Sequence, residues 1–167
     1  IKDVKLYKGG MPAEYGGRLS SVMDIKMKEG NSKKLAVSGG IGLISSKLTV
    51  EAPIVKNKGS FIISGRRTYA DVFLKASERF KDNTLYFYDL NAKANFRIND
   101  KNRIFASGYY GRDLLGFGDN FGIDWGNKTC TIRWNKIISN RLFLNTSVIY
   151  SDYNYNVKLK NGETNFN

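Results

Sequence analysis

The stretch Tyr86–Ile98, YFYDLNAKANFRI, decides the fold class because apolar and polar residues alternate along it. Successive side chains of an extended strand point to opposite faces, so this alternation predicts a β-strand with two different faces. The apolar face would carry Tyr86, Tyr88, Leu90, Ala92, Ala94, Phe96 and Ile98. The polar face would carry Asp89, Asn91, Lys93, Asn95 and Arg97.

Three other stretches repeat this alternation: Ser46–Ile54, Thr129–Ile137 and Arg141–Tyr150. After Tyr150 the aromatic residues change phase, which predicts a β-bulge near Ser151–Asp152. We expect about seven strands after residue 33, most of them about 9–12 residues long, against a usual length of about 5–6 in soluble proteins. Strands of ~9–11 tilted residues cross a bilayer.

Composition supports an all-β protein and excludes several kinds of site. The 167 residues include ten Tyr, ten Phe and 17 Gly but only two Pro, a profile that favours strands. The chain has no His and a single Cys, so we expect no enzyme, no cofactor, no metal site and no internal disulfide. The net charge of +12 points to an anionic partner and leaves nucleic acid, lipid head groups and lipopolysaccharide open.

The connections between the expected strands alternate in length. Segments 55–60, 99–103 and 138–141 are short and polar, whereas 69–83 and 113–126 read as long loops. Aromatic residues gather near the two ends of the strands: Phe96, Phe105, Trp134 and Phe143 by the short turns, and Tyr86, Tyr88, Tyr109, Tyr110, Trp125 and Tyr150 by the long loops. Two such bands are typical of the aromatic girdles of outer-membrane barrels. The alternative is a soluble β-sandwich, whose aromatic residues would be spread through its core.

We therefore expect antiparallel transmembrane β-strands, about seven of them, which form an incomplete barrel. Strand parity predicts that Leu90, Ala92, Ala94, Cys130, Ile132, Leu144 and Val148 face lipid. It predicts that Asp89, Asn91, Lys93, Asn95, Arg133 and Asn135 face the lumen. The short turns would be periplasmic and the long loops would lie at the cell surface.

The segment Leu6–Gly30, LYKGGMPAEYGGRLSSVMDIKMKEG, resembles the end of the plug domain in TonB-dependent outer-membrane receptors. The matching features are a strand that ends in a basic residue and Gly, a helical turn that leads to Tyr15-Gly16, and a last strand at residues 22–28. Gly59–Phe73, GSFIISGRRTYADVF, resembles the third barrel strand of the Bacteroidetes-type receptors. Two departures are Lys8, where the family often has Arg, and Asp24, where it often has Asn.

The resemblance implies two parts: residues 1–32, the C-terminal part of a plug domain, and residues 33–167, the N-terminal part of an outer-membrane β-barrel. The chain would then be a piece of a longer receptor in the outer membrane of a Gram-negative bacterium, which takes up a scarce or bulky ligand. Its partners would be an inner-membrane energy-coupling protein of the TonB type, the transported ligand, lipid and lipopolysaccharide, and a surface lipoprotein. Nucleic acid would not be a partner.

Four charged residues are candidates for contacts between plug and barrel: Lys8, Glu14, Arg18 and Glu51. The alternative for Glu14 and Arg18 is that they are solvated turn residues, which contribute little to stability. Of the adjacent Arg66 and Arg67, only one can point into a lumen, and the other would reach the lipid head groups. The alternative function is a soluble basic β-sheet protein that binds nucleic acid with aromatic side chains.

Overall fold

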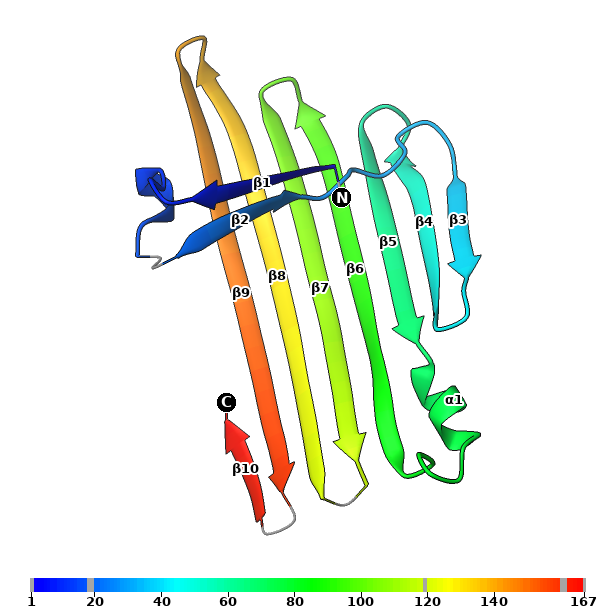
Figure 1. The fold of residues 1–167 in the computed structure, drawn as a ribbon. Coiled ribbons are helices and arrows are strands. Elements are labelled where there is room, and N and C mark those ends of the chain that lie inside the picture. The colour runs from blue at the N-terminus through cyan, green and yellow to red at the C-terminus, as the bar shows by residue number, and fades with distance from the viewer. Residues whose placement is uncertain (1, 18–19, 119, 160–161, 167) are drawn as a thin grey trace.

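The computed structural model describes residues 2–17, 20–118, 120–159 and 162–166 and is all-β, with one short helix and one 3-10 turn in the described part. Figure 1 shows the elements, which are β1 (Asp3–Lys8), η1 (Ala13–Tyr15), β2 (Ser21–Lys26), β3 (Ala36–Ile41), β4 (Ser45–Val55), β5 (Gly59–Thr68), α1 (Ala70–Lys75), β6 (Asn83–Asn99), β7 (Asn102–Phe117), β8 (Phe121–Ser139), β9 (Leu142–Leu159) and β10 (Gly162–Phe166). No described helix has the length and apolar character needed to span a membrane.

The strands form one large open sheet and one small one. Strands β3 to β9 follow each other in chain order as antiparallel neighbours, and the five-residue β10 extends the sheet beside β9. Strands β1 and β2 form a separate hairpin, which crosses the large sheet at a steep angle in Figure 1. The large sheet has two edges, β3 and β10, and is not closed into a barrel. The predicted antiparallel all-β class and the seven strands β3–β9 are therefore confirmed.

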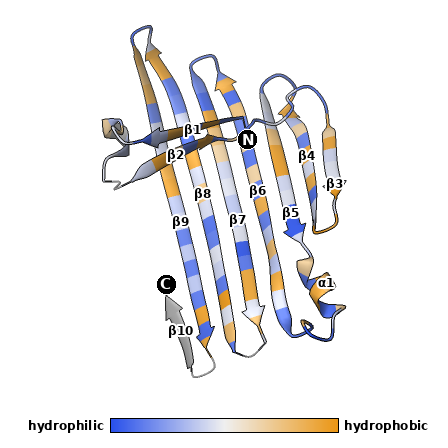
Figure 2. Cartoon of the chain, viewed as in Figure 1, coloured by the Kyte–Doolittle hydropathy of each residue, from blue (hydrophilic) through white to orange (hydrophobic). Residues whose placement is uncertain are grey.

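The cross-strand register gives the large sheet two chemically different faces. Asn91 pairs with Tyr109, Lys93 with Ser107, and Ala92 with Gly108, so the alternation of β6 continues into its neighbours. We call one side the polar face; it carries Thr49, Glu51, Ser60, Ser64, Asp89, Asn91, Lys93, Asn95, Ser107, Thr131, Arg133, Asn135 and Ser147. We call the other side the apolar face; it carries Leu48, Val50, Ile63, Leu90, Ala92, Ala94, Phe96, Ala106, Cys130, Ile132, Trp134, Leu144 and Val148. Figure 2 shows the resulting alternation of hydrophilic and hydrophobic residues along the strands.

The two ends of the sheet differ in their connections. We call the end with the tight turns after β4, β6 and β8 the turn end, and the opposite end, which includes α1, the loop end (Figure 1). At the loop end the segment 69–82 is a true loop that contains α1. The prediction of a long loop at 113–126 is wrong. Strands β7 and β8 extend into this segment, and only residues 118–120 separate them. Its Gly-rich composition resembled a loop, but Leu115 and Ile123 still pair across the strands, and Phe117 stacks on Phe121 at 6.2 Å.

Two further expectations about the strands are corrected. Strands β6 to β9 have 16 to 19 residues rather than 9–12. The predicted bulge at Ser151–Asp152 is absent, because the pairing of β8 with β9 runs without a shift from Leu159 to Phe143. Tyr150 and Tyr153 lie on opposite faces of a regular strand. The aromatic residues therefore move from the apolar face to the polar face without a bulge. The irregularities instead lie beside the tight turns, at Pro53/Val55, Arg97/Asn99 and Ile137/Ser139.

The predicted grouping of aromatic residues at the strand ends is only partly right. Phe96 and Trp134 lie on the apolar face near the turn end, and Tyr86, Tyr88, Tyr110 and Tyr150 lie on the same face toward the loop end. The register places the other strand-borne members of the two groups on the polar face: Phe105, Tyr109, Trp125 and Phe143. The strands continue beyond the ends predicted for them at the loop end, and the parity of these four residues had not been taken into account.

The chain buries almost no apolar core. Phe105 is the one hydrophobic side chain of the described part that is buried, whereas Glu51, Ser60 and Asn95 are all at most 8 % exposed. The accessible surface is 12404 Å², against about 8,300 Å² for a compact monomer of 18.9 kDa. The excess is that of a single-layer sheet, whose apolar face has no covering layer in the described part of the chain.

Candidate functional site

The small hairpin is built by local signals in the first 26 residues. Gly9 and Gly10 have positive φ values of 68° and 54°, which let the chain leave β1. The carbonyl of Pro12 accepts a hydrogen bond from Tyr15 N at 2.9 Å, which closes the turn η1. The ring of Tyr15 lies 5.3 Å from that of Tyr7. The strand, helical turn and second strand predicted here are confirmed.

One face of this hairpin is apolar and half-exposed. Val4 pairs with Ile25 and Leu6 pairs with Met23, so these four side chains share a face. Their exposed fractions range from 47 to 58 %. The hairpin therefore does not use this face to pack against the described part of the large sheet.

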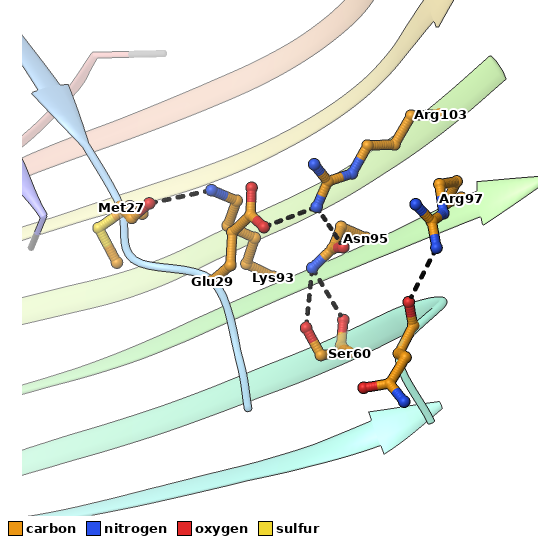
Figure 3. Close-up of polar contacts among 8 residues, drawn as sticks. Met27, Glu29, Ser60, Lys93, Asn95, Arg97 and Arg103 are labelled. Atoms are coloured by element: carbon orange, nitrogen blue, oxygen red, sulfur yellow. Dashed lines mark hydrogen bonds and ion pairs between the residues drawn. The ribbon is translucent and has the colours of Figure 1, made fainter. Parts of the chain in front are cut away.

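The contacts with the large sheet come instead from residues 27–32, which we call the strap. Figure 3 shows the strap crossing the polar face, where Lys93 Nζ donates a hydrogen bond to the carbonyl of Met27 at 3.0 Å. Lys28 Nζ lies 2.6 Å from Glu51 Oε1, and Glu29 Oε2 accepts a hydrogen bond from Arg103 Nη2 at 2.7 Å. Three successive strap residues thus bind three different strands: β6, β4 and β7.

Backbone geometry fixes the middle of the strap. A Cβ atom on Gly30 would lie 2.0 Å from the carbonyl oxygen of Phe61, so only glycine fits at this approach. Asn31 Oδ1 accepts hydrogen bonds from the backbone N–H groups of Lys33 and Lys34, at 2.9 and 3.2 Å. The carbonyl of Ser32 accepts a hydrogen bond from Asn57 N at 3.0 Å, which joins the end of the strap to the turn after β4.

Asn95 connects the strap to the wall of the sheet. This residue is 5 % exposed, and its Nδ2 donates to Ser60 Oγ at 2.9 Å (Figure 3). Its Oδ1 accepts a hydrogen bond from Arg103 Nη2 at 2.8 Å, the same nitrogen that binds Glu29. A continuous chain of polar contacts therefore runs from Glu29 through Arg103 and Asn95 to the buried Ser60.

Two arginines cover the buried aromatic ring beside this network. The guanidinium carbons of Arg103 and Arg133 lie 4.8 and 4.9 Å from the ring centre of Phe105. Such cation–π contacts contribute about 0.5–1 kcal/mol each at exposed sites and more when desolvated. The ring thus holds Arg103 in the position from which it binds both Glu29 and Asn95.

A second polar group lies on the same face toward the loop end. Arg66 Nε donates to Asp89 Oδ2 at 2.8 Å, and Asn91 Nδ2 donates to Asp89 Oδ1 at 3.2 Å. The guanidinium of Arg66 lies 4.8 Å from the ring centre of Phe87, whereas that of Arg67 lies 5.6 Å from Tyr86. The two adjacent arginines thus occupy opposite faces.

The predicted contact residues have different positions. Glu51 is buried and binds the strap through Lys28, a partner that the sequence did not indicate. Lys8 is exposed at the end of β1 and forms no ion pair with the described residues. Arg18 and the Glu14 side chain lie outside the described part. Sequence reasoning also missed Glu29 and Arg103, since the polar run 29–34 was interpreted as a boundary between two parts.

The six residues predicted to face a lumen share the polar face, and the seven predicted to face lipid share the apolar face. The strap is held to the polar face by partly exposed pairs, with side-chain exposures of 52 and 11 % for Lys28–Glu51 and 42 and 38 % for Arg103–Glu29. Such pairs contribute roughly 0–1 kcal/mol each. The arrangement therefore positions a segment firmly while each of its bonds remains easy to break.

Comparison of the chain with protein-family models, with curated proteins and with solved structures found no match. The resemblance of Leu6–Gly30 to a plug end therefore stays a prediction, as do the roles that it implies for Lys8, Glu14 and Arg18. The two faces of the sheet and the contacts of the strap are observed in the structure itself and do not depend on similarity to another protein.

Replacement of Gly30 by Ala is expected to release the strap, because the new methyl group would collide with the fixed Phe61 carbonyl. The measurement is the rate of tryptic cleavage after Lys33 and Lys34, which should rise strongly. Gly40→Ala is the control, since a Cβ there meets only the flexible Lys47 Cε at 3.8 Å. Equal cleavage rates in the two variants would contradict the tight approach at Gly30.

Replacement of Asn95 by Ala is expected to lower the free energy of unfolding by about 1–3 kcal/mol, because the buried Ser60 hydroxyl loses its side-chain partner and Arg103 Nη2 keeps only Glu29. Asn91→Ala, on the same strand and face, is the control. Asn91 forms one half-buried hydrogen bond, of 3.2 Å to Asp89. Its loss should lower the free energy of unfolding by less than about 1 kcal/mol. Urea titration of both variants provides the comparison. Similar losses in both would show that the Asn95 network is not the stronger one.

Proposed function

We propose that this chain is a part of a plugged outer-membrane β-barrel, a receptor of the TonB-dependent kind that takes up a scarce or bulky ligand. In this proposal strands β3 to β9 belong to the barrel wall, and the hairpin with its strap is the last part of the plug. The apolar face meets lipid and the polar face lines the lumen.

The observation that carries the proposal is the apolar band on one face of the sheet. On β6 this band, counted with the girdle residue Tyr88, runs from Tyr88 to Ile98, about 33 Å along the strand at ~3.3 Å per residue and about 25 Å in height at a tilt of ~40°. Tyr110 and Tyr150 lie near its loop end, and Phe96 and Trp134 lie near its turn end. An outward apolar band of about 25 Å between two aromatic girdles is the feature that a membrane barrel requires.

The polar face supports the lumen assignment. It binds the strap, which the proposal assigns to the plug, through Glu51, Lys93 and Arg103. In the described part of the chain, Asn127 Oδ1 and Asn135 Oδ1 on this face are buried without a hydrogen-bond partner. Such atoms are satisfied in a wet lumen or by additional plug residues.

The strap gives the proposed transport a physical basis. Uptake through a plugged barrel requires the plug to move or unfold under a pull from the inner membrane while its end stays attached to the wall. Several modest polar bonds between strap and wall suit this task, because each can break separately. The half-exposed apolar face formed by Val4, Leu6, Met23 and Ile25 is available to the remainder of a plug domain.

The proposal predicts that Ala92→Arg destabilises the membrane-folded receptor that contains this chain by about 2–4 kcal/mol, since residue 92 would lie near the bilayer midplane. Asn91→Arg, one residue away on the polar face, is the matched control and should have little effect. Urea titration of the receptor folded into lipid vesicles measures both. An Ala92→Arg variant as stable as Asn91→Arg, with Leu90 and Ile132 in a water-soluble core, would favour the alternative of a soluble β-protein.

The proposal also predicts the direction of the sheet in the membrane. In a Cys130→Ser background, cysteine at Asn120 of the loop end should react with an impermeant thiol reagent on intact cells. Cysteine at Asn140 of the turn end should react only after the outer membrane is permeabilised. The reverse pattern would place the turn end at the cell surface.

A further inference from the structure

The two ends of the large sheet carry the same number of cationic residues but very different numbers of acidic ones. The segments at the turn end, 28–34, 55–60, 97–103 and 136–142, contain ten Lys and Arg and two Asp and Glu. The segments at the loop end, 41–47, 66–89, 111–128 and 150–163, contain ten Lys and Arg and nine Asp and Glu. The turn end therefore holds most of the net charge of +12.

The cations of the turn end are available to a partner. Lys56, Lys58, Lys101 and Arg141 are exposed, and none of them forms an ion pair with the described residues. At the loop end, by contrast, Arg112 binds Asp124 and Lys128 lies 3.6 Å from Asp152. A surface with this many unpaired cations attracts anions in its surroundings.

These cations lie directly beside the aromatic rim of the apolar face. Lys136 Nζ lies 5.3 Å from the ring centre of Trp134, and Trp134 Nε1 donates to Asn102 Oδ1 at 3.1 Å. Trp with its ring on an apolar surface and its N–H bonded to a polar group is typical of membrane–water boundaries. Lys and Arg stems next to such a rim can lie along the apolar surface while their charges reach head groups.

A concave surface combines both properties at this end. It has a volume of about 790 Å³ between the turns after β6 and β8. Its lining includes the cations Lys101, Lys136 and Arg141 together with the exposed apolar side chains Leu142 and Leu144. A ligand that matches this lining has an anionic head and an apolar tail.

We propose that the turn end is a binding surface for anionic phospholipids of the leaflet in which it lies. This inference rests on the proposed membrane function and adds to it the class of lipid that the turn end binds. Lys56, Lys58, Lys101, Lys136 and Arg141 bind the phosphate groups, while the Trp134 rim and the groove at Leu142 and Leu144 contact the adjoining acyl chains. An acidic protein segment would satisfy the cations but would leave the apolar rim beside them without a partner.

The test uses the full 167-residue chain with Trp125→Phe, so that Trp134 is the single tryptophan. Binding to phosphatidylcholine vesicles, with and without phosphatidylglycerol, is measured by flotation and by quenching of Trp134 with brominated lipid. Phosphatidylglycerol should tighten binding, and the double variant Lys56→Gln/Lys58→Gln should lose about fivefold of this gain for each cation removed. The matched control Lys75→Gln/Lys81→Gln removes the same charge at the loop end and should keep the gain.

Each other outcome rejects a different statement. Binding to both kinds of vesicle with equal affinity, with Trp134 quenched, would overturn the phospholipid inference and leave the membrane proposal standing. Equal losses in the two double variants would reduce the effect to net charge and overturn the assignment to the turn end. Preferential binding to soluble polyglutamate would identify an acidic protein as the partner instead. An absence of binding to any vesicle would overturn the membrane proposal together with the inference.

Discussion

The structure depends on one constraint, the two-residue period of the extended backbone, which separates polar from apolar side chains over the width of a single sheet. A soluble protein covers the apolar side of such a sheet with a second layer. Here the described chain has no such layer, and Phe105, its one buried hydrophobic side chain, lies on the polar side. The described part of the sheet therefore presents an apolar face that its own residues do not cover.

The polar face shows how a sheet without a core still positions another segment. Burial is concentrated at Ser60, Asn95 and Glu51, where unsatisfied groups would be costly, so their hydrogen bonds determine where the strap can lie. The contact of Gly30 with the Phe61 backbone adds a steric requirement that only glycine meets at this position. Specific placement thus comes from geometry and polar satisfaction, while the individual bonds remain modest in strength.

The sequence predicted the elements whose periodicity is local and strong. The alternation in Tyr86–Ile98 fixed the faces of β6, and antiparallel pairing carried these faces to the neighbouring strands. The false loop at 113–126 arose because glycine content was weighed above the alternation of Leu115 with its neighbours. The strap contacts could not be predicted, because Glu29 and Arg103 are 74 positions apart and only the path of the chain over the sheet brings them together. Lys28 was not identified as the partner of Glu51 for the same reason.

The long strands also mark where the surroundings of the sheet change. On the apolar face of β7, Tyr110 is followed two residues later by Arg112, which binds Asp124 across to β8. On β9, Tyr150 is followed by Asp152, which lies near Lys128. The same face therefore passes from apolar side chains to paired charges within one side-chain repeat on two separate strands. A change this abrupt, offset by one side-chain repeat in register between the two strands, is what a boundary between hydrocarbon and water would impose on a sheet that crosses it. Under the proposed membrane function, the same change accounts for the length of β6 to β9, whose outer parts would have water on both faces.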